Sequence, residues 1–214
     1  MTFDFDTLDS TVAYKLLAAT VIPRPIAWVV TQDSAGHVNA APYSFFNVMG
    51  AAPPTVALGL LADPARGFKD TARNILDTGE FVINLVPERL AAAMNITAAD
   101  APRGINELEH AGMRTAPSDR VAPPRITDSP VSFECVVHTS VLTGPAQTVV
   151  IGRVLSARID DRFVTDAVRG HIDTDALDLV ARTSGSGYIR THDSFELVRP
   201  RWADLPTRPP GPAV

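Results

Sequence analysis

The apolar positions of this chain recur with a period of two over several short runs. The clearest run is residues 131–142, VSFECVVHTSVL, whose apolar face consists of Val131, Phe133, Cys135, Val137 and Val141. This alternation predicts a half-buried strand. Other runs rich in β-branched and aromatic residues predict strands at 26–32, 54–61, 80–86 and 148–160. The run at 54–61, PTVALGLL, is apolar almost throughout, which is typical of a strand buried on both faces.

The first strand is expected to begin a hairpin. Residues 33–36, DSAG, supply turn chemistry, and Gly36 is suited to a positive φ. Residues 37–41, HVNAA, then return antiparallel to the first strand. Pro42 has no N–H group, so the returning strand is expected to be bulged or to lie at a sheet edge.

Helical signals are shorter and fewer. Ser10 is a candidate N-cap for a helix over residues 11–20, and Asp70 or Thr71 is a candidate cap for a helix within 69–79 that ends at Gly79. Two more short helices are expected within 87–96 and 104–113. Because strands outnumber helices and follow one another through tight turns, the pattern predicts a mainly β fold, an antiparallel barrel, rather than a parallel βαβ sheet.

The domain organisation is simple. Residues 1–203 are predicted to form a single domain, in which residues 187–200 close the structured part. Residues 204–214 form a proline-rich tail that has little to bury, and it is expected to be disordered or draped on the surface.

Composition narrows the possible partners. The 214 residues carry a net charge of -5 with 45% hydrophobic residues, so the chain is expected to fold and not to attract nucleic acid. No apolar run approaches the roughly 20 residues that cross a bilayer, and the acidic start resembles no signal peptide. We therefore expect a cytoplasmic protein that does not enter a membrane.

Several familiar catalytic and binding motifs are incomplete. SGSGYIR has Arg190 where a dinucleotide loop needs its third glycine, and Ser184 stands where a nucleophile elbow around Ser186 needs glycine. The five histidines lack the spacing of metal ligands, so no metal site is expected. Cys135, the only cysteine, lies on the apolar face of a strand and is expected to be core packing rather than a reactive thiol.

An ordered set of segments carries a resemblance to a known family. VIPRPIAWVVT, NAAPYSFFNV, PPTVALGL, KDTARNI and GEFVINLV follow one another along the first half of the chain. SPVSFECVV, VIGRVLSARID and ARTSGSGYIRT continue the set, which covers nearly the whole chain except its two ends. In this order the segments resemble the flavin reductase-like proteins with an FMN-binding split β-barrel, a group that includes flavoredoxin.

The resemblance implies a six-stranded, Greek-key-like barrel, FMN as the cofactor, and a homodimer with its flavin sites at or near the subunit interface. The segment matching APYSFFN would run beside the flavin and offer its backbone and polar side chains as hydrogen-bonding partners. The residues carried over as cofactor-binding are Val30, Thr31, Ala41, Tyr43, Ser44, Phe45, Asn47, Arg66, Lys69, Asp70 and Thr71.

The chemistry of the residues supports part of this set independently. FMN carries a dianionic phosphate, and Lys69 beside a helix start offers a cation together with N–H groups that the helix does not use. Taken alone, Lys69 and Arg66 are better interpreted as solvated loop charges, and Phe45 and Phe46 as core aromatics. The resemblance favours the binding role for Lys69, Thr71 and Ser44, and leaves the two phenylalanines open.

Two positions concern the nicotinamide side of the site. Arg182 and Tyr188 match a stretch that the resemblance places near the nicotinamide or the partner's flavin, although Tyr188 is also a plausible core aromatic. Many relatives have a histidine where this chain has Gln147 and Thr148, which indicates either that the histidine is dispensable or that the reductase activity is altered. No protein residue is expected to be indispensable as a general acid or base, because the hydride transfer belongs to the cofactor.

The preferred function is an NAD(P)H:FMN oxidoreductase that uses NADH or NADPH and delivers reduced FMN, for example to a partner monooxygenase. The alternative is a flavoredoxin-like electron carrier that holds its flavin tightly and exchanges electrons with an electron-transfer protein. A third possibility is a barrel that has lost flavin binding and serves as a dimeric interaction module.

Overall fold

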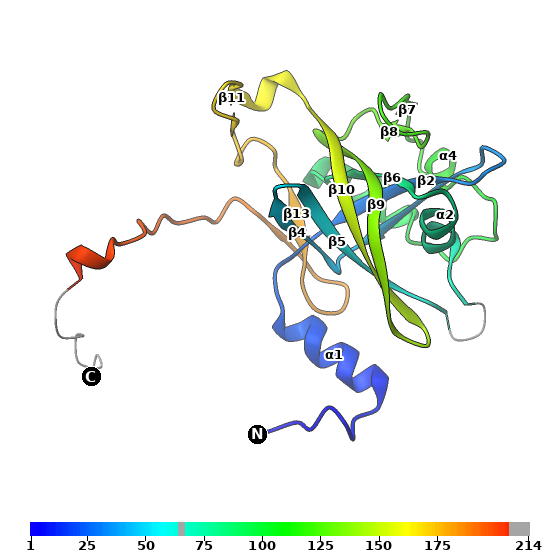
Figure 1. The fold of residues 1–214 in the computed structure, drawn as a ribbon, viewed down its shortest axis with the longest axis horizontal. Helices are drawn as coiled ribbons and strands as arrows, with labels where there is room; N and C mark the ends of the chain where they lie inside the picture. The colour runs from blue at the N-terminus through cyan, green and yellow to red at the C-terminus, as the bar shows by residue number, and fades with distance from the viewer. Residues whose placement is uncertain (64–66, 206–214) are drawn as a thin grey trace.

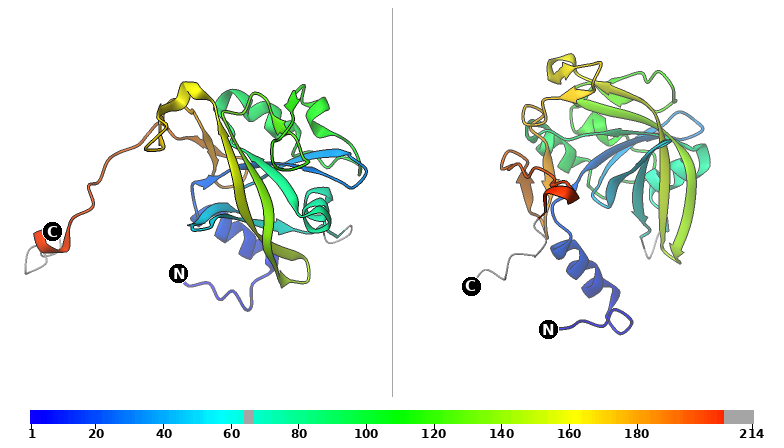
Figure 2. Two further views of the ribbon diagram at one scale, coloured as in Figure 1. Left: turned by 45° about the horizontal axis from the view of Figure 1, so that its top comes forward. Right: turned by 60° about the vertical axis from the view of Figure 1, so that its left-hand side comes forward.

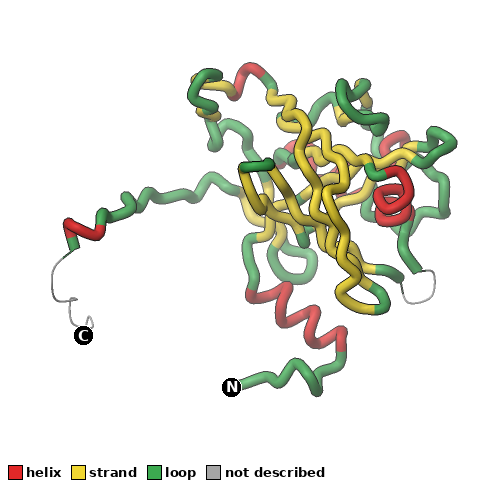
Figure 3. Tube along the Cα trace, in the orientation of Figure 1, coloured by secondary structure: helices red, strands yellow, loops and turns green. Residues whose placement is uncertain are grey.

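The computed structural model describes residues 1–63 and 67–205 and shows a curled antiparallel sheet with short helices at its margins (Figures 1 and 3). The sheet has seven strands in the order β3-β2-β6-β9-β10-β5-β4. Their bounds are β2 Ala27–Gln32, β3 Val38–Tyr43, β4 Phe46–Ala51, β5 Pro54–Leu61, β6 Glu80–Asn84, β9 Val131–Gly144 and β10 Gln147–Ile159. The mainly β prediction is confirmed, with seven strands in the main sheet where the resemblance implied six.

Smaller elements surround the sheet. The helices are α1 Ser10–Thr20, α2 Asp70–Thr78, α3 Ala91–Ile96 and α4 Glu107–His110, with 3₁₀ turns η1 Glu88–Leu90, η2 Asp161–Phe163 and η3 Trp202–Asp204. The short strands are β1 Arg24–Pro25, β7 Thr115–Ala116, β8 Arg125–Ile126, β11 Val164–Asp166, β12 His171–Ile172, β13 Val180–Arg182 and β14 Tyr188–Arg190. Strands β1, β13 and β14 form a separate three-stranded sheet. No helix in the described part of the chain has the length and apolar content that crossing a bilayer requires.

The predicted hairpin forms as expected. Gly36 adopts φ 91°, and β3 returns antiparallel to β2 with Thr31 opposite Asn39. Strand β3 is the edge strand of the sheet, so Pro42 removes no ladder hydrogen bond from a strand on its outer side. This edge position leaves one side of β3 free to meet helices and ligands.

Three local predictions were wrong. The side chain of Asp9, not Ser10, caps α1 by accepting a hydrogen bond from the Thr11 N–H at 2.8 Å. Helix α2 begins after Lys69 without a side-chain cap from the described residues, and neither Asp70 nor Thr71 caps it. Strand β5 is buried on one face only, because Val56, Leu58 and Leu60 point inward while the intervening residues stay partly exposed.

The helical and C-terminal predictions were too long. The segment 87–96 starts as the 3₁₀ turn η1 before α3, and only α4 forms within 104–113. After β14 the chain has no further strand in its described part and extends away from the barrel (Figure 2). The expected tail falls mostly at residues 206–214, which lie outside the described residues.

Two hydrophobic clusters lie on opposite sides of the curled sheet. The barrel interior contains Phe46, Leu58, Ile75, Phe81 and Cys135 among others. Burial raises the pKa of the Cys135 thiol to about 12, which agrees with core packing. The outer cluster, built around Trp28, Met94 and Leu108, fixes α3 and α4 against the sheet.

The first part of strand β9 differs from a simple half-buried strand because its polar face is also covered, whereas residues 138–143 are exposed, so the expected burial of Val141 was wrong. Ser132 and Glu134 are buried opposite the apolar face. The Glu134 carboxylate accepts hydrogen bonds from the backbone N–H groups of Asp119 and Arg120, at 3.0 and 2.6 Å. A buried carboxylate thereby holds the loop that covers this face, since a buried charge requires such partners.

Gly152 is required by the close packing of the barrel. A Cβ atom at Gly152 would overlap the ring of Phe81, which is fully buried. We expect Gly152→Ala to lower the free energy of unfolding by about 1–3 kcal/mol, because overpacking forces neighbours out of place. Urea unfolding measures the loss, and Gly144→Ala is the matched control because a Cβ there meets the flexible side chain of Gln147.

A double variant separates steric overlap from other effects. Combining Gly152→Ala with Phe81→Leu should cost less than the sum of the two single changes, since the smaller side chain gives the new methyl group room. Additive losses would contradict the steric explanation.

Candidate functional site

A cavity of about 650 Å³ opens beside the free edge of β3. Its walls come from β3 and the two residues that follow it, the end of β5, the start of α2, the segment 94–103, and the β13–β14 hairpin. The volume falls within the range of pockets that bind cofactors and other small ligands. The cavity therefore defines the candidate site.

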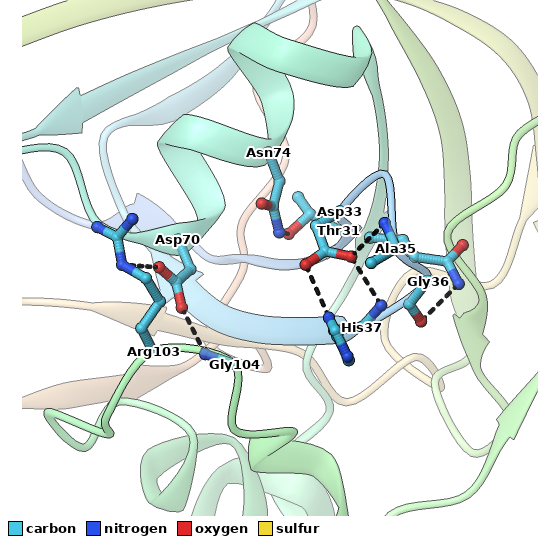
Figure 4. Close-up of polar contacts among 10 residues, drawn as sticks. Thr31, Asp33, Ala35, Gly36, His37, Asp70, Asn74, Arg103 and Gly104 are labelled. Atoms are coloured by element: carbon cyan, nitrogen blue, oxygen red, sulfur yellow. Dashed lines mark hydrogen bonds and ion pairs between the residues drawn. The ribbon is translucent and has the colours of Figure 1, made fainter.

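A buried polar network fixes β3 against α2 at the inner end of the cavity. The Asn39 side-chain amide donates to the Thr71 hydroxyl at 2.7 Å, and the Asn74 amide donates to the Thr31 hydroxyl at 3.0 Å. Figure 4 shows Asn74 reaching down from α2 to Thr31 on β2. Because all four side chains are buried, the network determines where the helix begins relative to the strand.

The N-terminus of α2 faces the cavity with N–H groups that the helix does not use. The first intrahelical hydrogen bond runs from the Arg73 N–H to the Lys69 carbonyl at 3.0 Å, so the N–H groups of Asp70, Thr71 and Ala72 precede it. Lys69 lies at this end, and its Nζ is 3.3 Å from Asp100 Oδ1. Unused N–H groups beside a cation are the features on which anion sites at helix N-termini are built.

Asp70 connects the start of α2 to the segment that forms the opposite wall. Its carboxylate accepts from the Gly104 N–H at 3.1 Å and lies 3.3 Å from Arg103 Nε (Figure 4). The carboxylate is thus engaged with protein partners, and its role in this structure is to hold residues 103–104 beside the helix.

The irregular segment after β3 supplies the aromatic wall. The Phe45 carbonyl accepts from the Gly59 N–H at 2.7 Å, and a Cβ at Gly59 would sit 3.0 Å from Phe45 Cβ, so this close approach depends on glycine. The Phe45 ring lies 5.8 Å from the ring of Tyr14 in α1. Phe46 instead points into the barrel core, which separates the roles of the two phenylalanines.

Tyr43 and Glu107 are half-buried ionisable groups on the cavity wall. Burial raises the pKa of Tyr43, and a contact with the Thr71 hydroxyl lowers it in part. Glu107 Oε2 accepts a hydrogen bond from the Ala40 N–H at 2.9 Å. This N–H group lies on the outer edge of β3 and points away from β2. Burial also raises the pKa of Glu107, against the lowering effect of the hydrogen bond from Ala40.

The mouth of the cavity is formed by the C-terminal hairpin. The Arg182 guanidinium stacks over the Tyr188 ring at 4.6 Å and donates to the Gly185 carbonyl at 2.7 Å. Arg24 joins this hairpin to the aromatic wall because it donates to the Thr183 carbonyl at 2.9 Å and lies 3.4 Å from the Ser44 hydroxyl. The hairpin is thereby fixed at the cavity opening.

The structure brings most of the sequence-predicted site residues together. The cavity is lined by Ala41, Tyr43, Ser44, Phe45, Lys69, Asp70, Thr71, Arg182 and Tyr188. Val30 lies in the outer hydrophobic cluster. Thr31 does not line the cavity, but its hydroxyl accepts the hydrogen bond from Asn74 that holds α2 beside the sheet. Asn47 is exposed, and its side chain accepts from the Val48 N–H at 2.8 Å. Arg66 lies outside the described residues.

Gln147 and Thr148, where the resemblance led us to expect a histidine, are not among the residues that line the cavity. Gln147 starts β10 opposite Leu61, and the buried Thr148 hydroxyl donates to the Val141 carbonyl at 3.2 Å. Leu61 itself lines the cavity, so Gln147 is close to the site through its strand partner.

Sequence reasoning missed the far wall of the cavity. This wall includes Met94, Asn95, Thr97, Arg103 and Glu107. A helix was expected around Glu107, but nothing in its local sequence indicates that its carboxylate reaches Ala40, which is 67 positions away. Asn39, which also lines the cavity, does lie in NAAPYSFFNV, one of the segments that carry the family resemblance.

Glu107→Gln is expected to flatten the pH dependence of stability. Because burial raises the pKa of Glu107, the folded state binds its proton more tightly than the unfolded state, and the free energy of unfolding falls as pH rises. This contribution is fully present below the unfolded pKa and is lost as pH rises through the raised folded pKa. The glutamine can still accept the hydrogen bond from Ala40.

Urea unfolding of both proteins in steps between about pH 4 and pH 8 measures this effect. The stability of the wild type relative to Glu107→Gln should decrease with rising pH, and Glu109→Gln on the exposed face of α4 is the matched control. A difference that stays constant across the range would contradict the raised pKa.

Comparisons with known proteins identify the family and support the description of the fold. A family model described as "Flavin reductase like domain" matches residues 19–176. An uncharacterised protein of Deinococcus radiodurans is 45% identical over 207 residues, which cover 94% of this chain and 90% of that protein.

Two solved structures are similar over almost their whole length. Nitrilotriacetate monooxygenase component B from Bacillus cereus has a TM-score of 0.86 at 31% identity, covering 92% of this chain and 98% of that one. The 2-nitrobenzoate 2-nitroreductase NbaA of Pseudomonas fluorescens has a TM-score of 0.86 at 32% identity, covering 97% and 99%. The family match over residues 19–176, the structural neighbours and the barrel itself lead to one conclusion: the chain belongs to the flavin reductase-like family of split-barrel proteins.

Proposed function

We propose that this protein is an FMN-binding oxidoreductase that reduces its flavin with NADH or NADPH. The observation that carries the proposal is the cavity itself, which combines an uncapped helix N-terminus and Lys69 with a wall of aromatic and polar groups. Membership of the flavin reductase-like family supports the class of cofactor.

The start of α2 fits the phosphate of FMN. The N–H groups of Asp70, Thr71 and Ala72 and the ammonium group of Lys69 would hold the dianion. Asp100 now pairs with Lys69 at 3.3 Å on the protein surface, where both side chains are about half exposed (53% and 56%), so an anion can compete for the lysine at little cost.

The segment from Ala41 to Phe45 fits the remainder of the cofactor. Strand β3 is an edge strand, so part of its backbone is available to a ligand rather than to a neighbouring strand. Ser44 and Tyr43 add hydroxyl groups, and Phe45 with Leu61 and Met94 adds apolar surface. A flat ring that carries a polar edge and a polyol chain needs this combination.

Bound FMN would supply a two-electron acceptor for the hydride of a nicotinamide. The protein residues would bind and orient the two rings and keep water away from them. Arg182 and Tyr188 at the mouth would receive the nicotinamide nucleotide, because the guanidinium can bind its phosphates and the exposed ring offers a stacking surface. No side chain of this site is assigned as a general acid or base.

We also propose that the protein works as a homodimer and passes its electrons to another protein, such as a monooxygenase. The similarity at 31% identity to a protein named as component B of a monooxygenase supports a partner of this kind. A flavoredoxin-like carrier, fed by a protein instead of by a nicotinamide, is the alternative outcome of the experiment that follows.

Anaerobic reduction tests the proposed reaction. Protein loaded with FMN should lose its visible flavin absorbance rapidly after addition of NADH or NADPH, faster than the same concentration of free FMN. If neither nicotinamide bleaches the flavin while dithionite does, the reductase proposal is wrong and the electron carrier takes its place. If FMN at saturating concentration fails to raise Tm, the protein does not bind FMN at all.

Lys69→Ala tests the phosphate site. We expect about a 10- to 150-fold loss of FMN affinity and a much smaller loss for riboflavin, which lacks the phosphate, because a charge-assisted hydrogen bond contributes about 1.5–3 kcal/mol. Titration followed by flavin fluorescence gives both Kd values.

Lys15→Ala is the matched control, because Lys15 and Lys69 are the two lysines of the chain and Lys15 does not line the cavity. Its FMN affinity should stay close to that of the wild type. Equal losses for FMN and riboflavin in Lys69→Ala would show that Lys69 does not hold the phosphate.

A further inference from the structure

The segment that follows β14, residues 192–205, is here named the C-terminal arm. Figures 1 and 2 show the arm leaving the barrel as an extended chain that ends far from the sheet. Beyond His192, its hydrogen bonds in the described part of the chain are internal, such as Ser194 N–H to the His192 carbonyl and Asp204 N–H to the Arg201 carbonyl. The arm therefore has no docking site on its own barrel in this structure.

The arm carries an unusual amount of exposed apolar surface. Phe195 is 84% exposed and Trp202 is 87% exposed, and Leu197 and Val198 between them are similarly uncovered. Single exposed apolar residues are common, but four large ones within eight positions indicate a surface that is covered by a partner.

The root of the arm is held firmly, so the arm starts from a fixed point. Arg190 donates to Glu88 at 2.6 Å, Thr191 N–H donates to the Leu179 carbonyl at 3.2 Å, and His192 Nε2 lies 2.7 Å from Asp178 Oδ1. The carboxylates and the imidazole also lie close enough together to suit a cation, but these ion pairs already occupy them.

The N-terminal part of the chain exposes a complementary surface. Residues 1–9 and α1 also project from the barrel, and their exposed large apolar residues include Phe3, Phe5, Val12, Tyr14 and Leu17. Asp4, Asp6 and Asp9 make this end acidic. The arm carries charges of both signs: Arg199 and Arg201 lie between its apolar residues, Asp193 and Glu196 precede them, and Asp204 pairs with Arg201 at 2.7 Å. The apolar content thus matches the arm to the N-terminal part, and the two arginines give the middle of the arm a local positive charge.

We propose that the C-terminal arm of each protomer docks on residues 1–9 and α1 of a second copy of this chain, an inference that rests on the homodimer of the proposed function. In Figure 1 the arm and α1 leave the barrel in different directions, which favours a contact between copies. A two-fold dimer forms the contact twice, since the arm of each protomer then meets the N-terminal part of the other. Phe195 and Trp202 would bury roughly 300–500 Å² per arm. Each protomer contributes one arm and one receiving surface of comparable area, so the area buried per protomer approaches the roughly 800 Å² per partner of a stable interface.

The contact also bears on the cavity. Tyr14 belongs to α1, lines the cavity and packs against Phe45. An arm docked on α1 would brace this wall, so the second copy would support the flavin site of the first without entering it.

Trp202 reports directly on the docking. Trp202 is exposed and Trp28 is fully buried, so subtraction of the Trp202→Phe spectrum isolates the emission of the arm. At concentrations where the measured mass is that of the dimer, twice 22.9 kDa, the Trp202 emission should be blue-shifted relative to a solvent-exposed tryptophan. On dilution, the mass should fall to that of the monomer, and the emission should shift to longer wavelength over the same concentration range.

Two results overturn the inference and are distinguishable. A dimer in which Trp202 emits as a solvent-exposed residue removes the arm from the interface but leaves the homodimer in place. A chain that is monomeric at every concentration removes the homodimer as well. FMN binding and nicotinamide oxidation are measured separately, so neither result is confused with failure of the proposed reaction.

Substitutions in the full chain test the same contact. Phe195→Ser combined with Leu197→Ser should raise the dimer Kd at least tenfold in analytical ultracentrifugation. Val168→Ser, which removes a 98% exposed apolar side chain between β11 and β12, is the matched control and should leave the Kd unchanged. An unchanged Kd in the arm variant overturns the inference.

A charge exchange tests the receiving surface. Arg199→Glu with Arg201→Glu, and separately Asp4→Lys with Asp6→Lys, should each weaken the homodimer, because each places like charges at both contacts. An equimolar mixture of the two variants should dimerise more tightly than either alone, since both contacts of the mixed dimer then pair opposite charges. A mixture no tighter than its components overturns the assignment to the N-terminal part.

Discussion

The site depends on how the free edge of β3 is held. An edge strand exposes a row of N–H and C=O groups, and proteins must cover or occupy that row. Here the Ala40 N–H donates to Glu107, the Asn39 amide donates to Thr71, and Pro42 removes one donor from the row altogether. The edge is therefore covered at its start and open toward Tyr43 and Ser44, and the opening coincides with the cavity. Together with the buried side chains of Ile75 and Leu108, these two hydrogen bonds hold α2 and α4 beside the strand, and with α2 the helix N-terminus that lines the cavity.

The charged side chains around the cavity also hold its walls in place. Asp70 is engaged by Gly104 and Arg103, Asp100 by Lys69, and Glu107 by the edge of β3. The carboxylates organise the segment 94–107 into a wall, since that segment contains only a few turns of helix and has little apolar surface to fix it. Of these pairs, only the exposed one between Lys69 and Asp100 can be exchanged for a ligand without exposing a buried charge. This exchange is what the proposed binding of an anion at the start of α2 requires.

The sequence predicted the parts of the structure whose cause is local. The strands at 26–32, 80–86 and 148–160, the turn at Gly36 and the end of α2 at Gly79 were visible because alternation and glycine conformation act over a few residues. The segment around Tyr43 and Ser44 was visible through the resemblance, because NAAPYSFFNV is one of the segments that carry it. Glu107 and Arg103 were not visible, because their roles come from contacts with Ala40 and Asp70 that are distant in sequence. The cap of α1 was misplaced by one residue, since Asp9 and Ser10 are both good caps and only the backbone geometry at Asp9 decides between them.

The hairpin β13–β14 connects the cavity wall with the C-terminal arm. Its Arg182 and Tyr188 border the cavity mouth, its Arg190 anchors the strand to Glu88, and the C-terminal arm begins two residues later. Arg24 links the same hairpin to Ser44 on the aromatic wall. The arm therefore begins on the same short three-stranded sheet that contributes Arg182 and Tyr188 to the cavity wall. Since the chemistry proposed for the site belongs to its cofactor, the protein can adjust the reaction mainly through access and orientation, and both depend on this hairpin.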